Sequence, residues 1–356
     1  MPDASPPRFA AHAYDLPLAT PFRIAYDTVT MSRNLLVTAE RGGLRGHGEA
    51  GPVPTITGED AVGTRERIGG WLTAGAPLPT AWPTDALGLA GSLAVQTALL
   101  DLEAREAGEP LCTHLRGRPP IDLVTTITLP LEDDGAMVER AKRHVAAGYR
   151  AFKVKAGGGL SGDLERIRLL RETVGSREIR VDANQGWSRA DAARALPVLA
   201  DLEVAVLEQP LAKRDLEGHA ALVAVGTVPI MLDESVFSPA DAQAAIATRA
   251  ADRINIKLQK AGSITAALAI ADLCEAADVP CMVGCMIESR VGILAGAHVA
   301  AAHQNIQWVD LDGHTFLAED PVSGGGTIEN GKLRMGRGAG LGLASVAAGV
   351  TIDAVA

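Results

Sequence analysis

Aromatic residues, cysteines and basic charge are all scarce in this sequence. Aromatic side chains make up 3% of the 356 residues, so the hydrophobic core must be largely aliphatic. The formal net charge of −10 argues against a nucleic-acid partner, because phosphate binding needs a basic face. With 47% hydrophobic and 21% charged residues, the composition is that of a soluble globular protein, long enough for a barrel and a second domain.

The few cysteines exclude two structural devices. They are Cys112, Cys274, Cys281 and Cys285. Four cysteines in a chain of this length do not make a disulfide framework. Cys281 and Cys285 have no second pair to complete a structural zinc site, so neither a cross-link nor a structural metal is expected.

Long hydrophobic runs are also missing. The longest stretch without Asp, Glu, Lys or Arg is Val291–Val309, which is interrupted by histidines and amides. It is therefore predicted to be a buried helix and loop rather than a membrane span. Met1–Arg8 lacks the apolar segment of a signal peptide. We expect a cytoplasmic protein without a membrane partner.

The first 120 residues have the pattern of strands followed by helices. Turn-prone residues in Thr20–Arg33 are expected to join the first two strands, and Gly42–Ala50 to lead into a third. The expected strands are Phe9–Leu16 and Asn34–Ala39, and the expected helices are Glu59–Ala74 and Gly88–Ala107.

From about residue 121, short Val- and Ile-rich runs alternate with Ala- and Leu-rich helical stretches. Repeated βα units predict a parallel sheet, and eight of them predict a TIM-type barrel. An open doubly wound sheet is disfavoured, because Gly157–Gly159 lacks the spacing of a phosphate-binding loop. The eight predicted strands are Leu123–Leu129, Ala151–Val154, Ile179–Val181, Val204–Leu207, Ile230–Leu232, Ile254–Ile256, Pro280–Val283 and Gln307–Leu311.

Reactive side chains recur at the C-terminal ends of consecutive predicted strands. They are Lys155, Asp182, Glu208, Asp233 and Lys257, at intervals of 27, 26, 25 and 24 residues. Because these strand ends meet at one mouth of a parallel barrel, we expect the side chains to converge. Each alone would be read as a solvated loop residue or a helix cap, but five on separate strands favour one shared site.

The chemistry of this set follows from its residue types. Three carboxylates without His or Cys form an oxygen site that suits Mg²⁺ better than zinc. A cation on a substrate carboxylate stabilises the enediolate that forms when the α-proton leaves. A nearby cation, Lys153 or the metal, favours the neutral amine of Lys155 and makes it a usable base. With Lys257 on the other side, a proton can leave one face and return on the opposite one, which is racemisation or epimerisation.

These motifs resemble those of the muconate-lactonizing subgroup of the enolase superfamily, over nearly the whole chain. The matching motifs are Lys153-Val154-Lys155, Val181-Asp182-Ala183-Asn184, Glu208-Gln209-Pro210, Leu232-Asp233-Glu234-Ser235 and Asn255-Ile256-Lys257. Gly46-His47-Gly48-Glu49-Ala50 and the helix Ala94–Leu111 resemble the N-terminal capping domain of that family. The resemblance implies an α/β fold: a modified (β/α)₇β TIM barrel, residues 121–323, under an α+β capping domain, residues 1–120. The Gly-rich, strand-like segment Gly324–Ala356 is expected to return to the capping domain.

The resemblance also implies roles for the site residues. A Lys base with Mg²⁺ is an established pattern in the enolase superfamily. The implied Mg²⁺ ligands are Asp182, Glu208 and Asp233, the implied acid/base pair is Lys155 and Lys257, and Asn184 and Glu234 would orient the ligands.

Residues near the last strands narrow the substrate. Asp310-Leu311-Asp312 resembles the Asp-x-Asp pair with which dipeptide epimerases hold a substrate ammonium group; the alternative is that either Asp caps the following loop. Thr128 matches a substrate-lining Thr of that group, and Met286 and Ile287 are either pocket wall or core.

One position departs from the pattern of alanyl-glutamate epimerases. They carry an Arg in the mobile capping loop after a Pro-Phe motif, and here Asp27 takes that position in Pro21–Asp27. An acid binds a glutamate carboxylate poorly, so the second residue of the dipeptide is expected to be cationic or polar rather than Glu. Arg23 lies close enough in sequence to serve an acidic substrate instead.

The resulting hypothesis is a Mg²⁺-dependent isomerase that inverts one Cα of an L,L-dipeptide by two-base 1,1-proton transfer, and that forms a homo-oligomer. Alternatives on the same scaffold are N-acylamino acid racemisation, o-succinylbenzoate synthesis and muconate cycloisomerisation, none of which needs a paired-Asp ammonium clamp. A catalytically silent binding protein of the same fold is the alternative from another class, and the complete set of five chemical residues argues against it.

Overall fold

Three long antiparallel strands form the sheet of the N-terminal region. The computed structural model describes residues 5–25 and 27–346. The strands are β1 (Arg8–Arg23), β2 (Thr28–Arg41) and β3 (Leu44–Ala50), in the order β1-β2-β3. The expected turn at Thr20–Arg33 is wrong, because Phe22 pairs with Val29 and Arg23 with Thr28 beyond a register shift. The β-branched run that starts at Thr28 favours a strand, so β1 continues to Arg23 and β2 already begins at Thr28.

Four helices complete this region. They are α1 (Pro54–Thr57), α2 (Ala61–Thr73), α3 (Gly88–Ala107) and α4 (Leu111–Arg116). The predicted helix Gly88–Ala107 is confirmed at both ends, and α2 begins where the Asp60 carboxylate accepts a hydrogen bond from the Gly63 N–H. Helix α3 lies so close to β3 that a Cβ on Gly48 would stand 2.0 Å from the carbonyl oxygen of Ala94.

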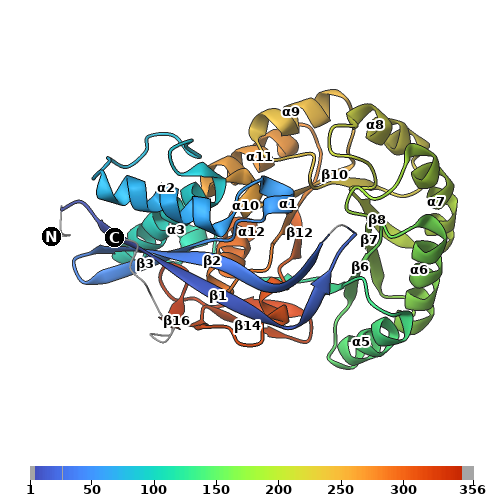
Figure 1. Ribbon diagram of the computed structural model, residues 1–356, viewed down its shortest axis with the longest axis horizontal. Helices are drawn as coiled ribbons and strands as arrows, with labels where there is room; N and C mark the ends of the chain where they lie inside the picture. Colours follow the sequence, from blue (N-terminus) through green and yellow to red (C-terminus); the bar gives the residue numbers. More distant parts are fainter. Residues whose placement is uncertain (1–4, 26, 347–356) are drawn as a thin grey trace.

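An eight-stranded parallel sheet forms a nearly closed barrel, in chain order from β5 to β12. Its edges meet where the Thr126 N–H donates to the carbonyl oxygen of Val309 at 3.3 Å. The strands are β5 (Ile127–Leu129), β6 (Ala151–Lys155), β7 (Glu178–Asp182), β8 (Val204–Glu208), β9 (Ile230–Leu232), β10 (Arg253–Lys257), β11 (Cys281–Gly284) and β12 (Ile306–Asp310). The helices between them are α5 (Asp134–Ala146), α6 (Leu160–Val174), α7 (Arg189–Asp201), α8 (Leu216–Val225), α9 (Pro239–Ala247), α10 (Leu258–Ala261), α11 (Ile264–Ala276) and α12 (Arg290–Ala302). Apart from the short α10, which directly follows β10 and is buried, they line the outside of the barrel in Figure 1.

The predicted barrel is confirmed, with one correction at its first strand. The expected run Leu123–Leu129 is divided into β4 (Asp122–Val124) and β5, and β4 belongs to a separate sheet. The break follows from side-chain exposure, because Asp122 and Val124 are exposed whereas β5 is fully buried. The charge-poor segment 291–309 is a buried helix followed by a strand, and no helix in the described part of the chain is long and apolar enough to cross a membrane.

The C-terminal segment lies between the two regions. Its strands are β13 (Val322–Gly324), β14 (Gly326–Glu329), β15 (Lys332–Met335) and β16 (Leu343–Val346). They pair among themselves and with β4 rather than with the N-terminal sheet. The segment still contacts the N-terminal helices, since the Leu111 N–H donates to Gly340 and the Leu341 N–H donates to Asp101. Its last part, residues 347–356, lies outside the described residues.

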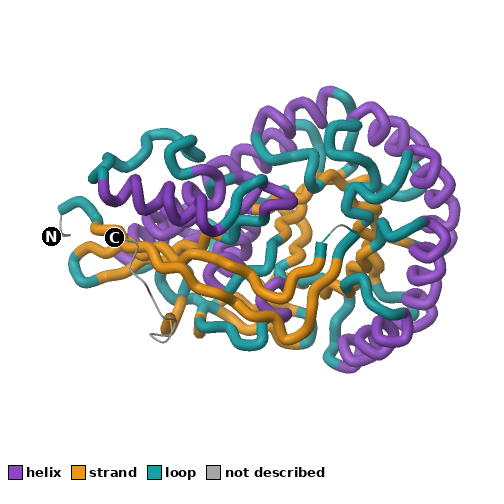
Figure 2. The backbone as a smooth tube through the Cα atoms, in the orientation of Figure 1, coloured by secondary structure: helices purple, strands orange, loops and turns teal. Residues whose placement is uncertain are grey.

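The β1–β2 hairpin extends from the N-terminal region across the barrel mouth (Figures 1 and 2). At its tip the Leu131 N–H donates to the carbonyl oxygen of Arg23 at 2.8 Å. Farther along β2, the Ser32 hydroxyl donates to the carbonyl oxygen of Ile287 at 2.9 Å. The hairpin therefore forms part of the roof over the C-terminal ends of the barrel strands.

Candidate active site

Three carboxylates meet at the C-terminal ends of neighbouring barrel strands. Asp182 ends β7, Glu208 ends β8 and Asp233 directly follows β9, and all three are completely buried. One carboxylate oxygen from each lies within 4.8 Å of the others. Hard oxygen ligands in this number suit Mg²⁺, which prefers carboxylates and keeps several waters.

Two lysines contact this carboxylate cluster from opposite sides of the barrel. Lys155 ends β6, and its Nζ lies 2.6 Å from Asp182 Oδ2. Lys257 ends β10, and its Nζ lies 2.7 Å from Asp233 Oδ2. Because β6 and β10 are four strands apart in an eight-stranded barrel, the two amines face each other across the mouth.

Glu208 is the carboxylate whose charge is least compensated. Burial, followed by the charge of Asp182, raises the pKa of Glu208 to about 8. Its Oε1 accepts a hydrogen bond from Asn255, whereas its buried Oε2 has no hydrogen-bond partner among the described residues, with Lys153 Nζ 3.9 Å away. An uncompensated buried oxygen beside two further carboxylates fits a bound divalent cation.

Asp233 and the lysines that contact it shift each other's pKa. Burial opposes ionisation of Asp233, but the ammonium groups of Lys257 and Lys260 lower its pKa. Burial favours the neutral amine of Lys257, yet the charge of Asp233 outweighs it and raises the pKa of this lysine. The ion pair with Asp233 thus favours the ammonium form of Lys257.

Asp310 ends the last barrel strand, β12, and Asp312 lies two residues after it. Asp310 forms an ion pair with Lys153, and Asp312 Oδ2 accepts a hydrogen bond from the Thr128 N–H at 2.6 Å. Burial, followed by the charge of Asp310, raises the pKa of Asp312 to about 7. Although Asp312 precedes the short 3₁₀ helix η1 (Gly313–Phe316), its side chain makes no capping hydrogen bond there. The loop-cap alternative is therefore wrong for Asp312.

A cavity of about 570 Å³ lies over these groups, within the size range of small-molecule sites. Both catalytic candidates on β6 and β10 line it, as do Lys153, Asp310 and Asp312. Thr128, Met286 and Ile287 line it too. Met286 and Ile287 therefore belong to the wall of the pocket and not only to the hydrophobic core. The barrel floor is charged, whereas most of the upper wall is apolar.

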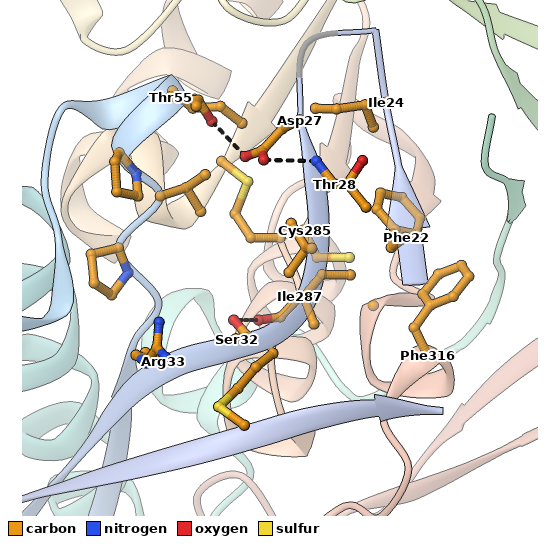
Figure 3. Close-up of a pocket in the computed structure, with 18 of the residues that line it drawn as sticks. Phe22, Ile24, Asp27, Thr28, Ser32, Arg33, Thr55, Cys285, Ile287 and Phe316 are labelled. Atoms are coloured by element: carbon orange, nitrogen blue, oxygen red, sulfur yellow. Dashed lines mark hydrogen bonds between the residues drawn. The ribbon is translucent and has the colours of Figure 1, made fainter. Parts of the chain in front are cut away.

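The capping loop places its two charged candidates differently. Asp27 lines the cavity; its Oδ1 accepts from the Thr28 N–H at 2.7 Å, and its Oδ2 accepts from the Thr55 hydroxyl at 3.3 Å (Figure 3). Arg23 is exposed and is not among the residues that line the cavity. The structure therefore brings Asp27, but not Arg23, to the site.

The expected orienting residues contact each other beside Asp182. Asn184 Nδ2 donates to Glu234 Oε1 at 3.1 Å, and the Asn184 N–H donates to Asp182 Oδ1 at 3.0 Å. Asn184 has a φ of +42°, a left-handed conformation that costs free energy for a residue with a Cβ. The strained turn holds the Asp182 carboxylate in position.

Several residues of the site were not predicted. Gln209 Oε1 accepts from the Asp233 N–H at 2.8 Å, and Lys260 Nζ lies 2.7 Å from Asp233 Oδ1. Asn255 donates to Glu208, and alternation along β10 could have located it, because residues two apart share a strand face with Lys257. Arg33 lines the cavity from β2, in the segment expected to be a turn.

Comparisons with known proteins agree with this geometry. The "hydrophobic dipeptide epimerase" of Enterococcus faecalis (strain ATCC 700802 / V583) is 37% identical over 93% of this chain and 97% of its own. The "L-Ala-D/L-Glu epimerase" of Bacillus subtilis (strain 168) is 35% identical over 93% of this chain and 94% of its own. A crystal structure of the dipeptide epimerase from Enterococcus faecalis V583 "complexed with Mg and dipeptide L-Leu-L-Tyr" superimposes with a TM-score of 0.90 and 36% identity, and covers 96% of this chain and 100% of that one.

These relatives are isomerases that act on amino-acid derivatives. The family model "Enolase C-terminal domain-like" matches residues 136–346, which include every barrel strand from β6 onward. With that match and the two relatives above, the chain belongs to the enolase superfamily.

Proposed function

We propose that this protein is a Mg²⁺-dependent dipeptide epimerase that inverts the Cα of the residue carrying the free carboxylate. One observation carries the proposal: two lysines on opposite sides, three buried carboxylates and a further pair of aspartates surround a single barrel mouth. The two curated relatives, which are epimerases, support this reaction, and the Enterococcus faecalis structure with Mg and a dipeptide supports the cofactor.

In the proposed mechanism, Lys155 and Lys257 each serve one face of the substrate Cα. Mg²⁺ held by Asp182, Glu208 and Asp233 would stabilise the charge that develops on the substrate carboxylate when the α-proton leaves. The neutral lysine on one face removes that proton, and the ammonium group on the other face donates one, so the configuration inverts. Proton removal by either lysine allows both stereoisomers to react.

The ammonium group of the first residue would bind at Asp310 and Asp312. Both side chains are buried and line the same cavity as the lysines, and Asp310 Oδ1 is a buried oxygen without a hydrogen-bond partner among the described residues. A substrate cation would compensate the charge that burial and Asp310 disfavour on Asp312. This requirement favours a free dipeptide over N-acylamino acids, o-succinylbenzoate precursors and muconates, which lack that ammonium group.

The second residue of the dipeptide is proposed not to be Glu, and to be cationic or polar. Its side chain leaves the inverted Cα toward the roof, where Asp27 lines the cavity and Arg23 does not. A carboxylate at this place repels an acidic side chain and attracts a cationic one. For the chain as a whole, we propose a capping domain of residues 1–120 with 324–356 over a barrel domain of residues 121–323.

The test is a library of L,L-dipeptides incubated with the protein and Mg²⁺ in D₂O. We expect deuterium uptake at the Cα of the second residue, and loss of this uptake when EDTA removes the metal. Uptake with a clear preference for a second-residue Glu would contradict the role given to Asp27. Mg²⁺ binding without exchange on any dipeptide or N-acylamino acid would favour a silent binding protein.

A further inference from the structure

Phe22, Ile287 and Phe316 line an apolar corner of the cavity near the proposed ammonium site. We propose that the first residue of the dipeptide carries a large apolar side chain, which packs into this corner. The inference rests on the proposed function and adds a substrate class to it. Figure 3 shows Phe22 and Phe316 on one side of the cavity, with Thr55 and Arg33 on the other.

Chain connectivity places the corner next to the ammonium site. Asp312 is followed directly by η1, whose last residue is Phe316. The start of η1 packs so tightly against the neighbouring loop that a Cβ on Gly313 would stand 2.1 Å from the carbonyl oxygen of Met286. The side chain of the first residue leaves the same Cα as its ammonium group, so it begins beside η1 and the loop that carries Ile287.

The two aromatic rings support each other. Phe22 and Phe316 contact edge to face, with ring centroids 4.8 Å apart and an interplanar angle of 67°. They come from different regions, since Phe22 lies near the end of β1 and Phe316 follows the last barrel strand. The loop at Ile287 is fixed because its carbonyl oxygen accepts from Ser32 and from Asn34 at 3.2 Å. The corner is therefore a preformed surface.

Apart from the proposed ammonium site beside the corner, the charged residues that line the cavity lie on elements other than β1, η1 and the loop at Ile287. Lys153, Lys155, Lys257, Asp310 and Asp312 come from barrel strand ends, and Asp27, Asp60 and Arg33 come from the roof. Asp27 accepts hydrogen bonds from Thr28 and from Thr55 of α1, and Figure 3 shows it between these two residues. The two rings and the Ile287 side chain offer no hydrogen-bond partner to a charged or amide side chain, whereas an apolar side chain gains free energy when it is buried against them.

The test compares L-Leu-L-Ala with L-Asn-L-Ala, whose first side chains have the same branched shape but opposite polarity. Both share the second residue, so the Asp27 hypothesis does not enter. The ratio of their kcat/KM values is measured from loss of the second-residue Cα proton signal in D₂O with Mg²⁺. We expect a ratio of at least about 10 in favour of Leu, the smallest discrimination typical of an apolar pocket.

The variant Phe22→Ala should lower this ratio about tenfold. The ratio is independent of how much of the variant folds, because an inactive fraction reduces both rates equally. Phe9→Ala is the matched control: Phe9 is also on β1 and in an edge-to-face pair, with Trp71, but neither ring lines the cavity. It should leave the ratio unchanged.

The outcomes separate this inference from the proposed function. Exchange with a ratio near 1 or in favour of Asn, or a ratio that Phe22→Ala leaves intact, would overturn the inference alone. Absence of exchange with every dipeptide would overturn the proposed function, and the inference with it. A ratio that falls equally in Phe9→Ala would also overturn the inference, because the effect would then not come from the corner.

Discussion

Lys155 and Lys257 can each act on the substrate without the other, because they come from strands on opposite sides of the barrel. Lys155→Ala or Lys257→Ala should each lower kcat for epimerisation by at least about a hundredfold, the usual contribution of general acid–base catalysis. Each variant should still exchange the Cα hydrogen of one stereoisomer, because one base remains. Polarimetry and deuterium uptake measure the two processes separately.

A suitable control for the lysine variants is Lys142→Ala. Lys142 is exposed and pairs with the exposed Glu139 on the same helix, so its loss should leave kcat unchanged. Full epimerisation by Lys155→Ala or Lys257→Ala would contradict the two-base mechanism.

Asp312→Asn tests the ammonium site with little change in shape. The amide oxygen of the variant can still accept from the Thr128 N–H, but the negative charge is lost. We expect KM for a dipeptide to rise about 10- to 100-fold, the strength of a hydrogen bond to a charged group, while kcat changes less. Steady-state kinetics measure both constants. An unchanged KM would favour an N-acylamino acid substrate, which has no charge to place there.

Sequence periodicity predicted which residues meet at the barrel mouth but not the contacts behind them. The spacing from Lys155 to Lys257 reflects strand ends, which topology alone brings together. Lys260 reaches Asp233 from the short helix α10, which directly follows β10 and interrupts the βα pattern that the periodicity predicts. Arg23 ends β1, whereas Asp27 directly precedes β2. The pairing at this end of the hairpin follows a register shift between Pro17 and Phe22, which the sequence pattern did not reveal.

At the scale of elements, the contact between α3 and β3 depends on glycine. A Cβ on Gly48 would stand 2.0 Å from the Ala94 carbonyl oxygen, which is backbone and has no rotamer to adjust. Gly48→Ala should therefore lower the free energy of unfolding by about 1–3 kcal/mol or more, as overpacking does. Urea unfolding followed by circular dichroism measures this loss.

Gly70, in the same region, has room for a side chain where Gly48 has none. It lies on the exposed side of α2, and a Cβ there would meet nothing within 4 Å. Gly70→Ala should stabilise the protein by about 0.5–1 kcal/mol, because alanine loses less backbone entropy in a helix. Equal effects of the two substitutions would show that close packing is not what fixes Gly48.

The contact between α12 and α4 should make stability depend on pH. The buried Nδ1 of His298 accepts a hydrogen bond from the Cys112 N–H at 3.1 Å, and burial lowers the pKa of His298 to about 4. As pH falls below about 6.5, the unfolded chain binds a proton that the folded state rejects, so stability is lost between about pH 6.5 and 4. The contribution of this one group is up to about 3 kcal/mol.

His298→Gln isolates this effect, because its amide oxygen can accept from Cys112 without titrating. Urea unfolding at pH 7 and pH 4 should show a smaller loss of stability in the variant than in the natural protein. Buried acids act in the opposite sense; burial raises the pKa of Asp320 to about 6, so the comparison of the two proteins matters rather than either curve alone. Parallel curves would contradict the assignment to His298.

Elements with clear local signals were predicted well, and those whose side chains face a partner from elsewhere were not. Helix α3 was predicted to the residue, and it ends before Gly108, which has the left-handed φ of 72° typical of a helix C-terminus. The sequence around Phe22 and Val29 resembles a turn when considered alone, because the apolar partner of Phe22 is Phe316, which follows the last barrel strand. β4 was merged with β5 because its pairing partner is the distant Leu333.

For the whole molecule, the barrel could be predicted and the exact path of the C-terminal segment could not. Eight βα repeats restrict the topology to a few arrangements, so strand order followed from sequence order. The C-terminal strands repeat no pattern, and their pairing with β4 depends on where the barrel begins. One of their contacts with α3 is the hydrogen bond that the Leu341 N–H donates to the buried carboxylate of Asp101.

A second buried carboxylate joins the cap to the barrel. Glu49, at the end of β3, accepts hydrogen bonds from the Ser289 N–H, the Ser289 hydroxyl and the Gly292 N–H at the start of α12. It also accepts from Asn34 at 2.7 Å, and Asn34 and Ser32 hold the carbonyl of Ile287. The roof over the cavity and the wall beneath it are thereby positioned by one side chain.

Glu49→Ala should destabilise the protein by several kcal/mol, because each buried donor left without a partner costs about 1–3 kcal/mol. It should also raise KM for dipeptides, since the loop at Ile287 loses its anchor, whereas loss of cap stability alone would leave the KM of the folded fraction unchanged. Thermal unfolding and steady-state kinetics measure the two effects. Glu139→Ala, which removes an exposed carboxylate paired with Lys142, should change neither. A stable Glu49→Ala variant with normal KM would mean that cap and barrel are joined mainly by the apolar contacts around α3 and α12, and not by this carboxylate.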